Sequence, residues 1–87
     1  MITTEQALEQ VRTERKYQDR KWGYPQNNTP FEWISILLEE VGELAEAMNN
    51  ALLGPCANGK MIDAIEEAVQ VAAVATSIVE HLTEEDV

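Results

Sequence analysis

Residues 29–55 of the chain read TPFEWISILLEEVGELAEAMNNALLGP, and this stretch has the start, the periodicity and the end of one long helix. Thr29 as the N-cap, Pro30 in the first turn and Glu32 three residues after Thr29 make a capping box. Gly54 and Pro55 end the pattern, because glycine terminates helices and proline does not continue them. The stretch therefore predicts a helix over residues 30–53.

Two further helices are predicted, one on each side of residues 30–53. Thr3 or Thr4 can cap a first helix over about residues 3–21. Residues 22–29, WGYPQNNT, are rich in Gly, Pro and Asn, and they predict a loop. Asn58 and Gly59 precede a third helix over about residues 60–82.

The composition favours a single all-α domain over residues 1–87. Of its residues 45% are apolar and 6% aromatic, which excludes a disordered acidic tail and argues against a turn-rich β-sandwich. The third helix is apolar or small on nearly every side between residues 68 and 79, as in helices that are buried all round. Because 87 residues cannot surround such a helix, we expect homo-oligomerisation, as a dimer or tetramer, to complete a four-helix-type bundle.

The charge and hydropathy of the chain exclude several classes of partner. A net charge of −10 disfavours nucleic acid and anionic membranes, although five of the six basic residues lie within residues 12–21. The uncharged run over residues 68–79 is too short to span a bilayer, and residues 1–6 do not resemble a signal peptide. The single Cys56 excludes an intrachain disulfide. We therefore expect a cytoplasmic protein.

Acidic residues interrupt an apolar sector of the second helix. At 100° per residue, the main apolar stripe consists of Ile34, Leu37, Leu38, Val41, Leu44, Ala45, Met48 and Leu52. Glu40 and Glu43 lie in a different sector, and their i, i+3 spacing lets the two side chains converge. Glu67 and Gln70 repeat this spacing in the third helix.

Antiparallel packing of the second and third helices would bring the two pairs face to face, as in carboxylate metal sites inside helical bundles. Adjacent carboxylates repel unless a cation or a proton lies between them, and hard oxygen ligands suit Mg²⁺ or Mn²⁺. Glu-rich helices are also commonly just solvated, so a surface position for the pair Glu40 and Glu43 stays open as the alternative.

Residues 39–47, EEVGELAEA, resemble the first half of the pattern of the MazG-like family of all-α nucleoside triphosphate pyrophosphohydrolases. That pattern is E-E-x-x-E, a spacer and E-x-x-D, and the 23 residues between Glu43 and Glu67 fit the spacer. Residues 14–23, ERKYQDRKWG, and residues 67–74, EAVQVAAV, are similar to further segments of the family. The resemblance covers most of residues 12–82.

The resemblance implies Mg²⁺-dependent hydrolysis of a nucleoside triphosphate, often a deoxy form, to a monophosphate and pyrophosphate in nucleotide-pool clearance. It implies Glu40, Glu43, Glu67 and Gln70 as metal ligands, with Glu39 orienting the attacking water. Gln70 stands where the family has Asp, and it offers a neutral carbonyl oxygen in place of a carboxylate.

The expected substrate contacts come from the first helix and the loop after it. Four basic residues are candidates for phosphate contact: Arg15, Lys16, Arg20 and Lys21. Gln18 and Trp22 are candidates for contact with the base, together with Asn27 and Asn28. Trp22, Phe31 and Trp33 are alternatively packing anchors between the first two helices.

Two other functions stay open. Phosphoribosyl-ATP pyrophosphohydrolase belongs to the same superfamily, but the short loop and the Trp-rich entrance resemble it less. The other alternative is a non-catalytic helical assembly or binding module with a degenerate metal site, for which Gln70 is the best support. Asp63, one turn before Glu67, either compensates in part for Gln70 or is an acid favoured by the helix N-terminus.

Overall fold

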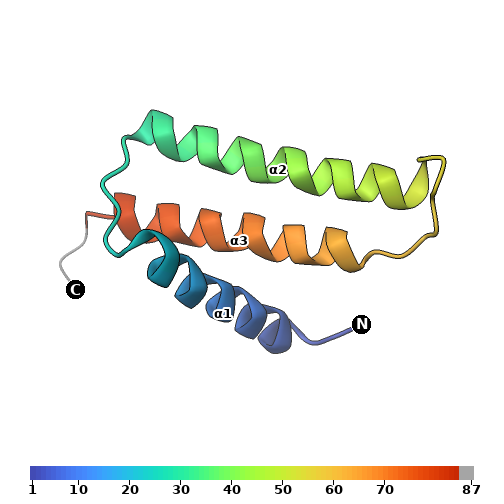
Figure 1. Cartoon of the computed structure of the whole chain (residues 1–87). Helices are drawn as coiled ribbons and strands as arrows, with labels where there is room; N and C mark the ends of the chain where they lie inside the picture. The colour runs from blue at the N-terminus through green and yellow to red at the C-terminus, as the bar shows by residue number, and fades with distance from the viewer. Residues whose placement is uncertain (85–87) are drawn as a thin grey trace.

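A computed structural model describes residues 1–84, and these contain three α-helices and no strand (Figure 1). Helix α1 covers Thr4–Trp22, α2 covers Pro30–Leu52 and α3 covers Ile62–Leu82. The all-α prediction is confirmed. Four boundaries differ from the prediction by one or two residues: α1 begins at Thr4 and ends at Trp22, α2 ends at Leu52, and α3 begins at Ile62. Across residues 1–84, none of the helices combines the length and the apolar character that crossing a bilayer requires.

Capping boxes begin the first two helices. Gln6 N–H donates to Thr3 Oγ1 at 3.1 Å, and Gln6 Oε1 accepts from Thr3 N–H at 2.9 Å. Glu32 and Thr29 exchange the same pair of hydrogen bonds at the start of α2, at 3.2 and 2.9 Å. Helix α1 ends at Gly23, whose φ of 86° suits glycine. These local signals fix where α1 and α2 lie in the chain.

Helices α2 and α3 form an antiparallel hairpin, and α1 packs obliquely on α3 (Figure 1). Within residues 1–84, the backbones of α1 and α2 do not come into close contact. Helix α3 is therefore the central element, and it presents different sides to α1 and α2. The start of α2 therefore lies beside the end of α3, where Trp33 packs on His81, and the middle of α2 lies beside the first half of α3.

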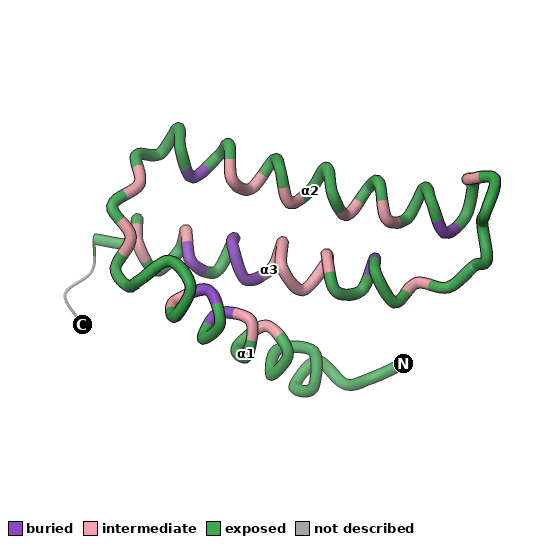
Figure 2. The backbone as a smooth tube through the Cα atoms, in the orientation of Figure 1, coloured by how far each residue is buried: buried purple, intermediate pink, exposed green. Residues whose placement is uncertain are grey.

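The core of the chain is small and consists mainly of small side chains. Its buried apolar residues are Trp33, Ala51, Ala64, Ala73 and Val74. Figure 2 shows these positions as short buried segments along helices that are otherwise exposed or half-buried. Residues 68–79 are not buried all round within one chain, since Ala75, Thr76 and Val79 are exposed. Completion of the bundle by a second copy stays a prediction.

His81 ties the loop between α1 and α2 to the end of α3. Its Nε2 accepts from Gln26 N–H at 3.0 Å, and its Nδ1 lies 2.7 Å from Ser77 O. The ring packs against Trp33 and Tyr24, with ring centroids 5.0 and 5.2 Å away. Trp33 is thus an anchor, but its partner is α3.

The other two predicted anchors do not pack between α1 and α2. Trp22 is 54% exposed and Phe31 is 85% exposed. The backbones of α1 and α2 come close to α3 but not to each other, so neither ring is enclosed between α1 and α2.

Candidate metal centre

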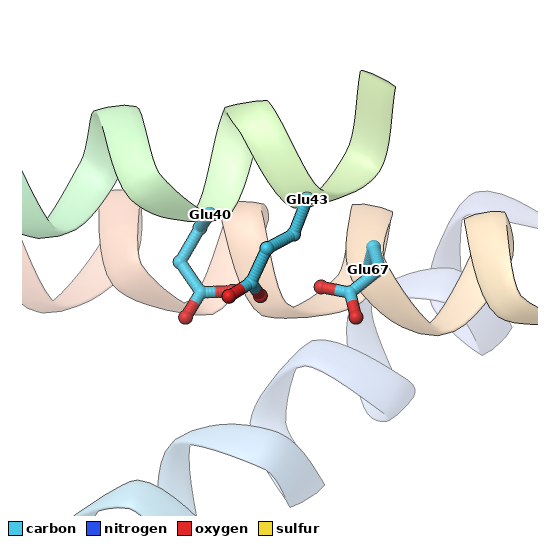
Figure 3. A group of neighbouring side chains, drawn as sticks. All are labelled: Glu40, Glu43 and Glu67. Carbon is cyan, nitrogen blue, oxygen red and sulfur yellow. The ribbon is translucent and has the colours of Figure 1, made fainter. Parts of the chain in front are cut away.

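Three acidic side chains converge between α2 and α3. Glu40 and Glu43 extend from α2 and Glu67 extends from α3, and Figure 3 shows their carboxylates turned toward one another. One carboxylate oxygen from each residue lies within 4.8 Å of the others. Glu40 and Glu67 are half-buried, and Glu43 is exposed. The structure therefore brings together the three acids whose spacing predicted convergence.

The helix positions explain why these acids face inward. Glu40 and Glu43 are one turn apart on the side of α2 that also carries the buried Trp33 and Ala51. On α3, the buried Ala64 precedes Glu67 by about one turn, so Glu67 begins on the side of α3 that is turned inward. The apolar sector that Glu40 and Glu43 interrupt is thus the face that packs on α3.

Gln70 lies at the same point. With its NH₂ group oriented toward the acids, the Gln70 amide donates to Glu40 Oε2 at 3.1 Å and to Glu67 Oε2 at 3.2 Å. Turned by half a rotation, the same amide presents Oε1 in place of NH₂. Gln70 can therefore either donate to the acids or join them as a neutral oxygen ligand.

The electrostatics of the cluster oppose ionisation of all three acids. Burial raises the pKa of Glu40, and the negative charges of Glu43 and Glu67 raise it further. Burial likewise raises the pKa of Glu67, with a further contribution from Glu43. Within residues 1–84, ion pairs join Arg12 to Glu9 and Arg15 to Asp19 and Glu80, so none reaches the cluster.

The donor set fits a hard divalent cation. Mg²⁺ binds oxygen at about 2.0–2.1 Å with octahedral geometry, so two ligand oxygens on one ion lie roughly 3–4 Å apart. The oxygens of Glu40, Glu43 and Glu67 are within 4.8 Å of one another, and small side-chain rotations cover the difference. A divalent cation would also remove the mutual repulsion of the carboxylates.

A hollow of about 550 Å³ borders the cluster on the side of Glu40. We call it the amide hollow, because its lining includes Gln18, Gln26, Asn27 and Asn28, together with Trp22, Trp33, Glu39 and Glu40. The Nε1 atom of Trp33 is buried and has no hydrogen-bond partner. All four residues predicted to contact the base thus line a space next to the acids: Gln18, Trp22, Asn27 and Asn28.

A second hollow, of about 680 Å³, borders the cluster on the side of Glu43 and Glu67. We call it the acidic hollow, because Glu46, Asp63 and Glu66 also line it. Asp63 is exposed in the first turn of α3, where the helix dipole favours an acid. Asp63 is not part of the three-acid cluster itself.

The structure separates the predicted phosphate contacts from one another. The Arg15 side chain is 7% exposed, and its guanidinium forms a bidentate pair with Glu80 at 2.7 and 3.1 Å. It also donates to Gln18 Oε1 at 3.2 Å. Arg15 is therefore engaged within the fold, which does not suit the expected contact with a phosphate.

Lys16 and Lys21 are both exposed. Lys21 Nζ lies 4.8 Å from the centre of the Trp22 ring, and Trp22 lines the amide hollow. Lys21 thus contacts a residue that lines the amide hollow, and its positive charge lies near the edge of that hollow. Glu39, the expected water-orienting residue, is exposed and lines the same hollow.

Glu14 is a further acid near the cluster, although it is not one of the three converging residues. It lies half-buried on α1, burial raises its pKa, and its charge contributes to the raised pKa of Glu40. Its signal in the sequence is its place at the start of the segment ERKYQDRKWG over residues 14–23. Glu14 thus adds a negative charge near the cluster from α1, whereas the three converging acids come from α2 and α3.

Searches against family models, curated proteins and solved structures give no match for this chain. The resemblance to MazG-like enzymes accordingly rests on the residues quoted above and on their spacing.

Proposed function

We propose that this chain hydrolyses a ribo- or deoxyribonucleoside triphosphate to the monophosphate and pyrophosphate, using Mg²⁺ or Mn²⁺. The convergence of Glu40, Glu43 and Glu67, with Gln70 beside them, carries the proposal. The MazG-like spacing of the same residues supports it. In this proposal the chain acts as a cytoplasmic homo-oligomer that clears nucleotides from the pool.

The four residues of the cluster hold the cation. Glu40, Glu43 and Glu67 supply carboxylate oxygens, and Gln70 supplies Oε1 once its amide has turned away from the hydrogen bonds to Glu40 and Glu67. When bound, Mg²⁺ offsets the carboxylates and stabilises the negative charge that develops at the α-phosphorus. The raised pKa values of Glu40 and Glu67 fit this role, because a cation favours their ionised form.

Glu39 orients the water that attacks the α-phosphorus. It lies next to Glu40 in the sequence but points to the amide hollow, where it is accessible to solvent. Its carboxylate accepts a hydrogen bond from the water and aligns it with the bond that breaks, between the α-phosphorus and the oxygen of the leaving pyrophosphate.

The amide hollow takes the nucleoside part of the substrate. Its donors and acceptors include Gln18 and Asn28, and Trp22 offers an aromatic surface at its edge. Asn28 Nδ2 already donates to Gln26 Oε1 at 3.0 Å, which leaves the Asn28 carbonyl oxygen free to accept. Lys16, Arg20 and Lys21 are the remaining candidates for phosphate contact, since Arg15 is engaged with Glu80.

A second candidate function is a non-catalytic helical binding module. The hydrogen bonds from the Gln70 amide to Glu40 and Glu67 favour it, because a neutral donor there partly satisfies the acids without any cation. In that case the charge of −10 serves solubility, and the cluster is a degenerate metal site.

Pyrophosphate release, measured across a panel of ribo- and deoxynucleoside triphosphates with Mg²⁺ or Mn²⁺, separates the two functions. We expect turnover of at least one nucleotide, and a loss of roughly 100-fold or more for Glu40→Gln, which removes a ligand charge. Glu46→Gln removes the same charge from an exposed position on α2 and retains activity. Robust turnover by Glu40→Gln would remove Glu40 from the mechanism. A folded chain that hydrolyses none of the nucleotides would be a binding module.

A further inference from the structure

The bottom of the amide hollow consists of side chains that are almost fully buried. We call it the floor, and it comprises the lining residues that are more than nine-tenths buried: Gln18, Trp33, Val74 and Ser77. These residues come from all three helices, whereas the loop residues 26–28 form an exposed or half-buried rim. Because the floor is shielded from water, its hydrogen-bonding groups decide which part of a ligand fits against it.

The amide of Gln18 has a fixed orientation. Its Oε1 accepts from Arg15 Nη1 at 3.2 Å, and the same guanidinium is held by Glu80 at 2.7 and 3.1 Å. A guanidinium has only donors, so the carbonyl oxygen of Gln18 has to face it. The NH₂ group of Gln18 therefore faces away from Arg15, and it has no hydrogen-bond partner within residues 1–84. Since Gln18 lines the amide hollow, the group that it presents there is a donor.

The other polar groups of the floor can also donate. Trp33 Nε1 is buried without a partner, and an indole N–H cannot accept a hydrogen bond. His81 Nε2 accepts from Gln26 N–H, so the neutral ring carries its proton on Nδ1, which lies 3.3 Å from Ser77 Oγ. The Ser77 hydroxyl therefore faces a donor and keeps its own proton to donate. Val74 is apolar, so the floor presents donors.

Buried donors without an acceptor are uncommon in folded proteins, because each one has lost its hydrogen bonds to water. Gln18 and Trp33 place two such donors in one floor. The hollow above them, of about 550 Å³, has the size of a small-molecule pocket. The floor therefore suits a ligand group that only accepts hydrogen bonds, such as a carbonyl oxygen.

A nucleotide with its phosphates at the acidic cluster turns its base toward this floor. Glu40 belongs to the cluster and also lines the hollow. Trp33 precedes Glu40 by about two turns of α2, which is about 10 Å along the helix axis. On α3, Glu67 lies in the first third of the helix and Ser77 in the last third. The base edge opposite the sugar is the part farthest from the phosphates, so this edge meets the floor.

We propose that the floor selects nucleobases with a carbonyl oxygen on the edge opposite the sugar, and that Gln18 determines this selection. Uracil, thymine, guanine and hypoxanthine carry that oxygen, whereas cytosine and adenine carry an amino group at the same place. An amino group would bring its N–H donors against the donors of the floor and leave both unpaired. The inference rests on the proposed function, because it places the phosphates at the cluster.

Matched pairs of nucleotides test the selection without a change in size. The nucleotides dUTP and dCTP differ by an oxo or amino group on a pyrimidine, and dITP and dATP differ in the same way on a purine. In each hydrolysed pair, we expect the oxo member to have a kcat/KM roughly tenfold or more above that of the amino member. Equal values within the pairs, or a preference for the amino members, would overturn the selection and leave the proposed hydrolysis intact.

Gln18→Glu tests the assignment to Gln18. One carboxylate oxygen keeps the contact with Arg15, and the other replaces the donor of the floor by an acceptor. We expect the preference for the oxo members to fall roughly tenfold or to reverse. Gln10→Glu makes the same change at an exposed position of α1 and keeps the wild-type preference. An unchanged preference in Gln18→Glu would overturn the assignment.

Binding of free nucleosides separates a failure of this inference from a failure of the proposed function. Deoxyuridine and deoxycytidine are titrated into the wild-type chain in EDTA, and binding is followed by the fluorescence of its two tryptophans, which both line the hollow. We expect deoxyuridine to bind roughly tenfold more tightly. If the chain hydrolyses none of the triphosphates, this difference supports the selection by itself. Equal affinities, or no binding of either nucleoside, would then overturn it.

Discussion

Helix α3 takes part in two acidic clusters, and only one of them contains a cation from the chain. Toward its C-terminal end, Glu80 pairs with Arg15 of α1, whose Nη2 also lies 2.9 Å from Asp19 Oδ1. The hydrogen bonds from Arg15 lower the pKa of Glu80. Toward its N-terminal end, Glu67 meets Glu40 and Glu43 of α2, and no ion pair of residues 1–84 includes them.

The two clusters differ in whether the fold places a cationic side chain beside the acids. Arg15 is held on the face of α1 that meets α3, so this fold does place a buried guanidinium beside acids. At Glu40 and Glu67 the pKa is raised instead, chiefly by burial. If all three acids of that cluster are ionised together, the balancing charge has to come from outside the chain.

Of the effects that this comparison predicts, the largest is the loss of stability when the Arg15 guanidinium is removed. Arg15→Met leaves the carboxylates of Asp19 and Glu80, each 34% exposed, without their cation, and we expect it to lower the free energy of unfolding by about 2 kcal/mol. Urea unfolding at a fixed protein concentration measures the loss. Arg12→Met, which removes the exposed pair with Glu9, changes stability by about 0.5 kcal/mol or less. Equal effects of the two variants would mean that the Arg15 cluster is not structural.

Adding a charge to the other cluster sharpens the contrast. Gln70→Asp replaces the amide by a fourth carboxylate, and we expect it to tighten Mg²⁺ binding roughly tenfold and to maintain or raise activity. Titration calorimetry measures the affinity. Gln10→Asp adds the same charge at an exposed position on α1 and leaves the affinity unchanged. Unchanged or weaker Mg²⁺ binding by Gln70→Asp would exclude Gln70 from the metal ligands.

The two clusters predict opposite pH effects on stability in EDTA. The lowered pKa of Glu80 stabilises the fold above its ordinary value of 4.5 and loses this effect as the pH falls. Because the pKa of Glu40 is raised, this residue stabilises the fold below the ordinary pKa of 4.5. The stabilisation is lost as the pH rises from 4.5 through the raised pKa.

At pH 7, Glu80→Gln should therefore destabilise the chain and Glu40→Gln should stabilise it, each by about 1 kcal/mol. Both differences shrink as the pH falls in urea titrations repeated at each pH, and the Glu80 difference is lost only below its lowered pKa. If Glu40→Gln destabilised the metal-free chain at pH 7, the cluster would not be a site of repulsion.

The sequence predicts the helices and the acidic cluster because their signals are local. The capping boxes at Thr3 and Thr29 fix two helix starts. The i, i+3 spacing of Glu40 and Glu43 needs only an antiparallel neighbour that carries Glu67 to bring the acids together.

What the sequence left open depends on packing between helices. Periodicity defines the stripe from Ile34 to Leu52 but not which of its residues meet α3, and most of the stripe is outside the hairpin. The charge of Arg15 suggested a phosphate, whereas its partner Glu80 lies 65 residues away and is not visible in any local pattern. His81 likewise acts as a loop anchor only once α3 meets Gln26.

The melting temperature with and without Mg²⁺ tests the central claim most directly, because a cation that binds only the folded chain stabilises it. With Mg²⁺ at ten times its Kd, the gain is about 1.4 kcal/mol, or roughly 6–11 °C for a domain of this size. We predict this rise for the wild-type chain and for Glu46→Gln, and no rise for Glu40→Gln. An unchanged melting temperature of the wild-type chain in millimolar Mg²⁺ and Mn²⁺ would contradict a metal site at Glu40, Glu43 and Glu67.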